Sequence, residues 1–221
     1  MGTAVRLVDA VSLANDARRN LILRARAVQP DGTARPVIVK ATRATDYDPA
    51  DPDAFEKSGL VKEWAATAWL TRAAPARRHS PRFLAGDAAL GLIVFEDLGA
   101  NLGSLVGPLL DGTPAVATAA LVAYAASLGG LHADTLDCGA SHAASLTAAF
   151  PMVNAMPPGG GERWRRGVVG KVHGLLGGNL PDDEVATIAR RMAAPGPWLG
   201  LVHRDPCRDN VLLIDGAARL I

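Results

Sequence analysis

The chain has 221 residues, of which 49% are hydrophobic and 20% are charged, and this composition excludes a chain that is disordered throughout. Its length suits one domain or two small lobes and allows a sizeable core. The 23 basic and 22 acidic residues nearly cancel, which argues against a strongly basic nucleic-acid-binding protein.

The first 45 residues predict β-strands. An apolar, β-branched stretch, VRLVDAVSL, spans residues 5–13. It is followed by NLILRARAV (20–28) and PVIVKAT (36–42), which flank a segment rich in Pro, Asp and Gly. Two strands around such a turn predict an antiparallel hairpin.

The strand PVIVKAT carries a lysine at its end. A period of two places Ile38 and Lys40 on one face and Val37 and Val39 on the other. By itself this lysine is a weak signal, because a solvated lysine at the end of a strand is common.

A helix and two further strands are predicted next. From Phe55 to Arg72 the apolar residues follow a helical pattern, and Glu63 lies on this helix. A short strand within PRFLAGD, a turn at Gly86–Asp87 and the apolar strand LGLIVFE follow. The glycine-containing run DLGANLGSLVG (97–107) then indicates a linker.

The second half of the chain has mostly helical character. Residues 112–133 carry no formal charge and predict a helix from Val116 to Ala133. We interpret it as a buried core helix and not as a membrane span, because alanine contributes little to insertion and basic flanks are absent. The segment DDEVATIARRMAA (182–194) predicts another helix, and NVLLI, the turn Asp215–Gly216 and ARLI predict a final hairpin.

One loop near the C-terminus combines residues that carry chemistry. His203, Arg204 and Asp205 are followed by Asn210 at the start of an apolar strand, in the pattern H-x-D-x-x-x-x-N. A carboxylate at this position can orient and deprotonate a hydroxyl group. An asparagine oxygen is a suitable ligand for a hard cation such as Mg²⁺.

Several motifs taken in order resemble the protein-kinase-like phosphotransferases. They are VIVK at 37–40, VFEDL at 94–98, LHAD at 131–134 and VHRDP at 202–206, with Glu63 on the helix between the first two. Within that group the chain resembles the aminoglycoside phosphotransferase and choline kinase-like family of small-molecule kinases. The likeness covers nearly the whole chain.

The resemblance implies an α+β, two-lobed, protein kinase-like fold. Residues 1–97 would form an N-lobe with an antiparallel sheet and one helix. Residues 98–221 would form an incomplete, mainly helical C-lobe with the catalytic loop. The family transfers phosphate from ATP to a hydroxyl of a small molecule, with Mg²⁺ as cofactor.

The resemblance also implies a nucleotide site. Lys40 would hold the α- and β-phosphates, and Glu63 would pair with Lys40 and keep it extended. The backbone around Glu96–Leu98 would bind the adenine, and Ile38 and Leu212 would sandwich the ring.

In the loop, the resemblance gives each polar residue a role. Asp205 would position or deprotonate the acceptor hydroxyl, and Asn210 would bind Mg²⁺. His203 would be a hydrogen-bonding residue of the loop and not an acid–base group.

Three departures from the family pattern keep alternatives open. The segment between the first two strands has no glycine. Arg204 and Arg208 stand where small-molecule kinases usually have Gly and Pro, and Arg204 gives the form found in protein kinases, so a protein kinase is one alternative. The chain ends at Ile221, where the family continues with a Mg²⁺-chelating Asp.

This last departure predicts a C-terminally truncated chain with weak ATP binding and little transferase activity. The other alternative is a nucleotide-binding pseudokinase or regulatory module. We expect a small hydroxylated molecule as partner, and neither nucleic acid nor a membrane; the acceptor and the oligomeric state stay open. Cys138 and Cys207 suggest no disulfide framework, and with no secretory signal at the N-terminus a cytoplasmic location is expected.

Overall fold

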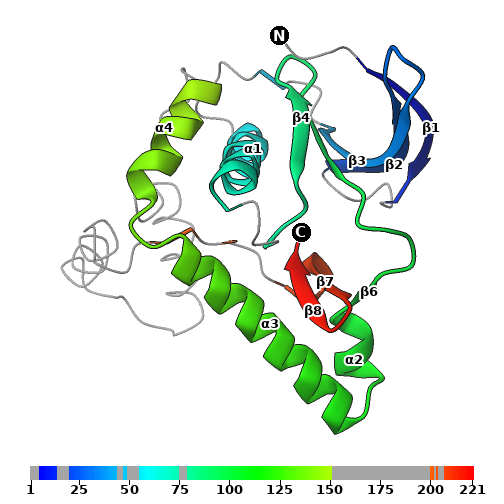
Figure 1. Cartoon of the computed structure of the whole chain (residues 1–221), viewed down its shortest axis with the longest axis vertical. Coiled ribbons are helices and arrows are strands. Elements are labelled where there is room, and N and C mark those ends of the chain that lie inside the picture. The colour runs from blue at the N-terminus through cyan, green and yellow to red at the C-terminus, as the bar shows by residue number, and fades with distance from the viewer. Residues whose placement is uncertain are drawn as a thin grey trace, which may run out of the picture.

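The described part of the chain forms a mixed α+β fold with two antiparallel sheets (Figure 1). The larger sheet has five strands and the smaller has three. The structure is a computed structural model, and it describes residues 5–13, 20–43, 47–48, 55–74, 79–150, 200–201, 203 and 207–221. The predicted helix at 182–194 lies outside these residues.

The five-stranded sheet contains the N-terminal strands in the order β1-β2-β3-β5-β4, and every neighbouring pair is antiparallel. This confirms the predicted antiparallel sheet. The strands are β1 (Arg6–Ser12), β2 (Asn20–Val28), β3 (Ala34–Thr42), β4 (Phe83–Asp87) and β5 (Leu92–Glu96).

The two faces of β3 are buried against different partners, as its alternating pattern predicts. Val37 and Val39 are 0% and 3% exposed and pack with Ala25, Ala27 and Val94 of the neighbouring strands. Ile38 packs on the other face, against a cluster of Leu60, Ile93 and Phe95. Lys40 shares the face of Ile38, because side chains two residues apart in a strand point the same way.

Helix α1 (Phe55–Ala73) is covered on two sides. Toward the five-stranded sheet, Leu60 packs with Ile93 and Phe95 of β5. Away from that sheet, Val61 and Ala65 pack with Leu146 and Phe150 from α4 (Gly139–Ala149) and its C-terminal end. The sequence pattern did not predict α4, which lies beside α1 in Figure 1.

The turn between β4 and β5 lies later than the expected Gly86–Asp87. Both residues belong to β4, and the turn occupies residues 88–91. A Cβ atom at Gly86 would overlap the ring of Trp64, so glycine is needed there for close packing and not for a turn. Gly91 has φ +61°, a left-handed conformation that glycine adopts without strain.

The expected linker at 97–107 contains regular structure. It includes strand β6 (Gly103–Ser104) and the start of helix α2 (Val106–Leu110). β6 pairs with β7 (Val211–Ile214), which pairs with β8 (Ala217–Leu220). Asp215 and Gly216 join β7 to β8 with φ angles of +49° and +75°, as a two-residue hairpin turn of type I′ requires, so the predicted final hairpin is confirmed.

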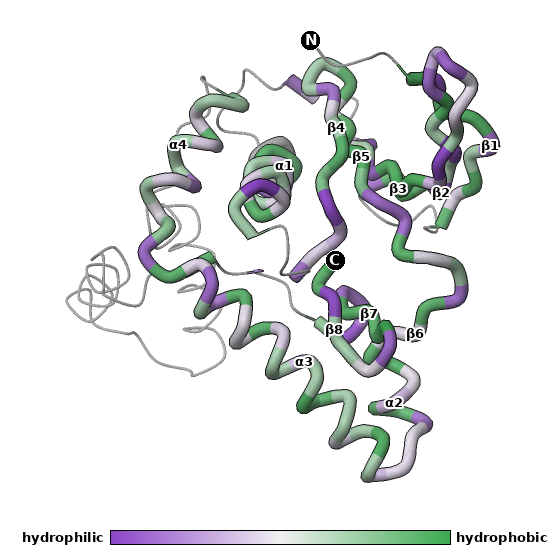
Figure 2. The backbone as a smooth tube through the Cα atoms, viewed as in Figure 1, coloured by the Kyte–Doolittle hydropathy of each residue, from purple (hydrophilic) through white to green (hydrophobic). Residues whose placement is uncertain are grey.

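Helix α3 (Pro114–Asp134) is buried along one side only. Ala120 and Leu131 are buried in a core with residues of α1, β7 and β8, whereas Val122 is 63% exposed. The expected buried core helix is therefore buried on one side and exposed on the other. The α3 backbone is coloured mainly green and pale along its length (Figure 2), so its composition did not reveal which side is packed. By length and composition alone, α3 could cross a membrane.

Candidate functional site

An ion pair between Lys40 and Glu63 joins the five-stranded sheet to α1. The Nζ atom of Lys40 donates to both carboxylate oxygens of Glu63, at 2.8 Å from Oε1 and 2.6 Å from Oε2. Lys40 lies near the end of β3, and Glu63 lies in the first half of α1. The pairing expected between these two residues is thus present in the structure.

The ion pair is partly open to solvent. The side chains of Lys40 and Glu63 are 23% and 28% exposed. An ammonium group has three N–H donors, and two are directed at the carboxylate of Glu63, which leaves one for a further acceptor. The Lys40 ammonium is therefore fixed to Glu63 in a position that is partly open to solvent.

The segment after β5 is fixed by contacts on both sides. The backbone N–H of Glu96 donates to the carbonyl of Arg82 at 3.0 Å, and the N–H of Arg82 donates to Oε1 of Glu96 at 3.0 Å. Leu98 follows and is half-buried. The backbone N–H and the side chain of Glu96 are therefore both used in contacts with Arg82, directly before β4.

Ile38 and Leu212 lie on different sheets. Ile38 is half-buried on the Lys40 face of β3. On β7, Val211 and Leu213 pack against the core that contains Leu131, so alternation places Leu212 on the opposite face of the hairpin. Each is a half-buried apolar side chain available to cover one side of a flat ligand.

The loop with His203 is tied to the end of β8. Nε2 of His203 lies 3.0 Å from the carbonyl oxygen of Ile221. The N–H of Ile221 donates to the carbonyl of Asn210 at 2.9 Å, and the N–H of Asn210 donates to the carbonyl of Cys207 at 2.9 Å. The role expected of His203, a packing and hydrogen-bonding residue and not an acid–base group, stays a prediction. Asp205 lies outside the described residues.

A Mg²⁺ site would draw on Asn210, whose side-chain oxygen is a hard ligand. Asn210 ends a short 3₁₀ turn (Arg208–Asn210) directly before β7 and is half-buried. In the portion of the chain that the structure describes, no group of three or more His, Cys, Asp or Glu side chains could hold a metal ion. Asn210 is therefore the one described residue that was expected to bind Mg²⁺, and that role stays a prediction.

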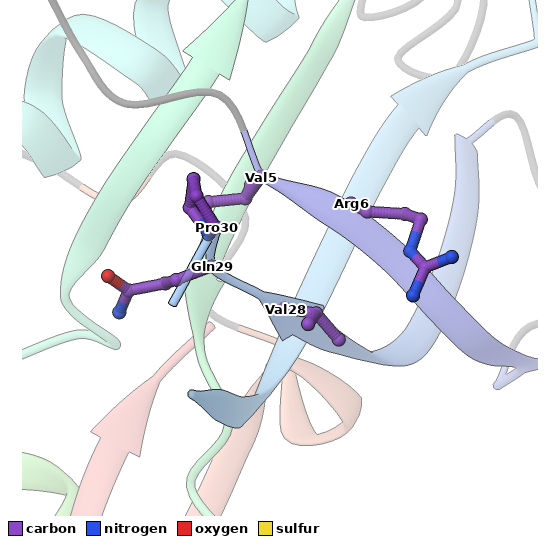
Figure 3. Close-up of a pocket in the computed structure, with 5 residues that line it drawn as sticks. All are labelled: Val5, Arg6, Val28, Gln29 and Pro30. Atoms are coloured by element: carbon purple, nitrogen blue, oxygen red, sulfur yellow. The ribbon is translucent and has the colours of Figure 1, made fainter. Parts of the chain in front are cut away.

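A shallow surface cavity of about 360 Å³, wide open to solvent, lies elsewhere on the five-stranded sheet (Figure 3). Its lining comes from the start of β1 and the end of β2. Ile22 of β2 pairs with Lys40, and Val28 at the cavity is six residues further on, which is about 20 Å along a strand. The cavity is therefore separate from the Lys40 site. It is lined by Val5, Arg6, Val28, Gln29 and Pro30.

Sequence reasoning missed two polar contacts near the site. Arg24 of β2 contacts Asp97 directly after Glu96, and His79 contacts Asp134 at the end of α3. Arg24 could have been noticed in the sequence, because it is a charged residue within an otherwise apolar stretch of the first predicted hairpin. The partners of both residues are more than 50 positions away in sequence, so spacing carried no signal for either pair.

The chain was compared with models of protein families and with curated proteins, and neither comparison finds a match.

Proposed function

We propose that this chain is an ATP-dependent phosphotransferase that acts on a hydroxyl group of a small molecule. The proposal includes a two-lobed, protein kinase-like arrangement with a nucleotide site between the five-stranded sheet and the hairpin of β7 and β8. The observation that carries it is the ion pair between Lys40 and Glu63.

The ion pair supports the proposal because phosphoryl transfer depends mainly on positioning and on charge neutralisation. A lysine held extended by a helix carboxylate offers a fixed positive charge to the oxygens of a triphosphate. The same pairing of a strand lysine with a helix glutamate is needed for activity in protein kinases. Lys40 and Glu63 have this geometry, with Nζ 2.6 Å from Oε2.

The remaining nucleotide contacts follow from the surroundings of Lys40. The adenine would bind the backbone of Glu96–Leu98, which continues β5 beside β3. Ile38 would cover one side of the ring and Leu212 the other. Both are apolar and half-buried, as a base-binding residue requires.

In the proposed reaction, Asp205 accepts a hydrogen bond from the acceptor hydroxyl and takes its proton. The hydroxyl oxygen bonds to the γ-phosphorus as the bond from that phosphorus to the β,γ-bridging oxygen breaks, which yields a phosphate ester and ADP. Bound Mg²⁺ supplies neutralisation of phosphate charge, and Asn210 would be one of its ligands. The free thiols of Cys138 and Cys207 suit a cytoplasmic location.

Isothermal titration calorimetry with MgATP tests the nucleotide site. We expect the purified chain to bind MgATP and Lys40→Met to weaken binding by at least about tenfold, because a phosphate contact is lost. Arg35→Met is the matched control, since Arg35 is an exposed cation on the same strand. It should bind as the wild type does.

Transfer is tested separately, by ADP release in the presence of a panel of aminoglycosides, choline, sugars and amino alcohols. We expect weak acceptor-dependent ADP release from the wild type, and Asp205→Asn should abolish it and leave MgATP affinity unchanged. Absence of MgATP binding by the wild type, or full binding by Lys40→Met, would overturn the proposal.

A further inference from the structure

Arg24 of β2 binds the segment that follows β5 through three contacts. Its Nε lies 2.7 Å from Oδ2 of Asp97, and its NH2 donates to Oδ1 of Asp97 at 3.1 Å. The same NH2 donates to the carbonyl of Gly99 at 2.6 Å. One guanidinium group therefore holds both ends of a three-residue segment.

The Asp97 carboxylate also binds the backbone of its own segment. Its side chain is only 6% exposed, and Oδ1 accepts the backbone N–H of Gly99 at 2.9 Å. Gly99 has φ +120°, which a residue with a Cβ rarely adopts. The carboxylate fixes the turn locally, and Arg24 fixes the carboxylate to the sheet.

The position of Arg24 in the sheet places it on the face of the proposed nucleotide site. Arg24 is directly opposite Ile38 in the register of β2 and β3, and directly opposite residues of an antiparallel pair share a face. Ile38 in turn shares its face with Lys40. The Arg24 guanidinium therefore extends from the face of the sheet that carries Ile38 and Lys40 to the segment that contains Leu98.

We infer that Arg24 is a positioning residue for the purine base: it holds the backbone of Leu98 in the conformation that binds the base edge. This inference rests on the proposed function. An unbraced segment would have to become ordered when the nucleotide binds, and that ordering reduces affinity. Arginine suits the task, because its planar fork binds both oxygens of a carboxylate, whereas a lysine acts as a single point charge.

The chain offers a matched control two residues further along the same strand. Arg26 is also paired with an aspartate, at 3.6 Å between NH1 and Oδ2 of Asp9. The side chains of this pair are 57% and 67% exposed, and the pair joins Arg26 to Asp9 of β1 and not to the segment after β5. Arg26→Lys makes the same chemical change as Arg24→Lys in an exposed setting.

The experiment compares two probes, MgATP and magnesium tripolyphosphate, by calorimetry on the full chain. Tripolyphosphate keeps the phosphate chain and lacks the base. We expect Arg24→Lys and Asp97→Asn to weaken MgATP binding about five- to tenfold and to leave tripolyphosphate binding unchanged. Lys40→Met should weaken both, and Arg26→Lys neither.

A second measurement needs no ligand. Amide hydrogen exchange in the free protein should show that Gly99 loses protection in Arg24→Lys and keeps it in Arg26→Lys, because exchange reports local opening. Unchanged MgATP affinity in Arg24→Lys, or equal losses for both probes, would overturn the inference and leave the proposed function standing. If the wild type binds neither probe, the proposed function fails together with this inference.

Discussion

His79 and Asp134 form a largely buried hydrogen bond, with Nε2 of His79 2.7 Å from Oδ2 of Asp134. The contact joins the segment before β4 to the end of α3. The backbone carbonyl of His79 also accepts the N–H of Leu220 in β8 at 3.0 Å. Three parts of the chain that are far apart in sequence therefore meet at His79.

Asp134→Ala should destabilise the protein. The side chain of His79 is only 10% exposed, so its ring nitrogen would lose a partner in a site that water reaches poorly. We expect the free energy of unfolding to fall by about 1–3 kcal/mol, measured by urea denaturation. Asp111→Ala, at an exposed aspartate, should change it by less than about 0.5 kcal/mol. Equal effects of the two substitutions would contradict a role for the hydrogen bond.

Gly86→Ala should be costly although it adds a single methyl group. The new Cβ would overlap the ring of Trp64, so the ring or the strand must move. Overpacking of this kind costs about 1–3 kcal/mol, which thermal or chemical denaturation can measure. A Cβ at Gly103 meets no atom within 4 Å, so Gly103→Ala serves as the control and should leave stability nearly unchanged.

His142 should make stability depend on pH. Burial lowers the pKa of His142 below its ordinary value of 6.5, and its ring lies edge-on to Trp69 with centroids 6.2 Å apart. At pH values below about 6.5, the His142 ring takes up a proton more readily in the unfolded chain than in the folded chain. Lowering the pH therefore reduces the free energy of unfolding, until the pH drops below the pKa of His142 in the folded chain.

Melting temperatures at pH 7.5 and 5.5 measure this effect. His142→Leu should show a smaller decrease between the two pH values than the wild type. An identical decrease in both proteins would show that other groups cause the pH dependence.

Glu63→Gln should affect nucleotide binding more than stability. The ion pair with Lys40 is about one quarter exposed, and pairs of this kind contribute about 1 kcal/mol or less. The substitution removes the charge that holds Lys40 extended, so MgATP affinity should fall several-fold. Urea denaturation and calorimetry on the same preparation separate the two effects. A stability loss of several kcal/mol with unchanged affinity would refute this assignment.

The sequence predicted those parts of the fold in which a local pattern determines the outcome. The alternation in β3 predicted that Ile38 and Lys40 share a face, and the structure buries Val37 and Val39 on the other face. The turn Asp215–Gly216 was predictable since both residues tolerate positive φ. The pairing of Lys40 with Glu63 came from a family resemblance and not from spacing, because 23 residues separate them.

Other features depend on contacts that no local pattern encodes. The side of α3 that is packed could not be read from a helix with apolar residues all round. Gly86 looked like a turn residue, and only the ring of Trp64 shows why a strand contains glycine there. The role of Arg24 depends on the carboxylate of Asp97, which is 73 positions away in sequence. Asp205, the proposed catalytic residue, remains a prediction.

The cover that α4 gives to α1 has a consequence for synthesis of the chain. The sheet and α1 leave the ribosome before residues 139–149, so Val61 and Ala65 face water until α4 emerges. A newly made chain would therefore expose this apolar side of α1 to water. The exposure would last while more than 60 further residues are translated, at about 5–20 residues per second.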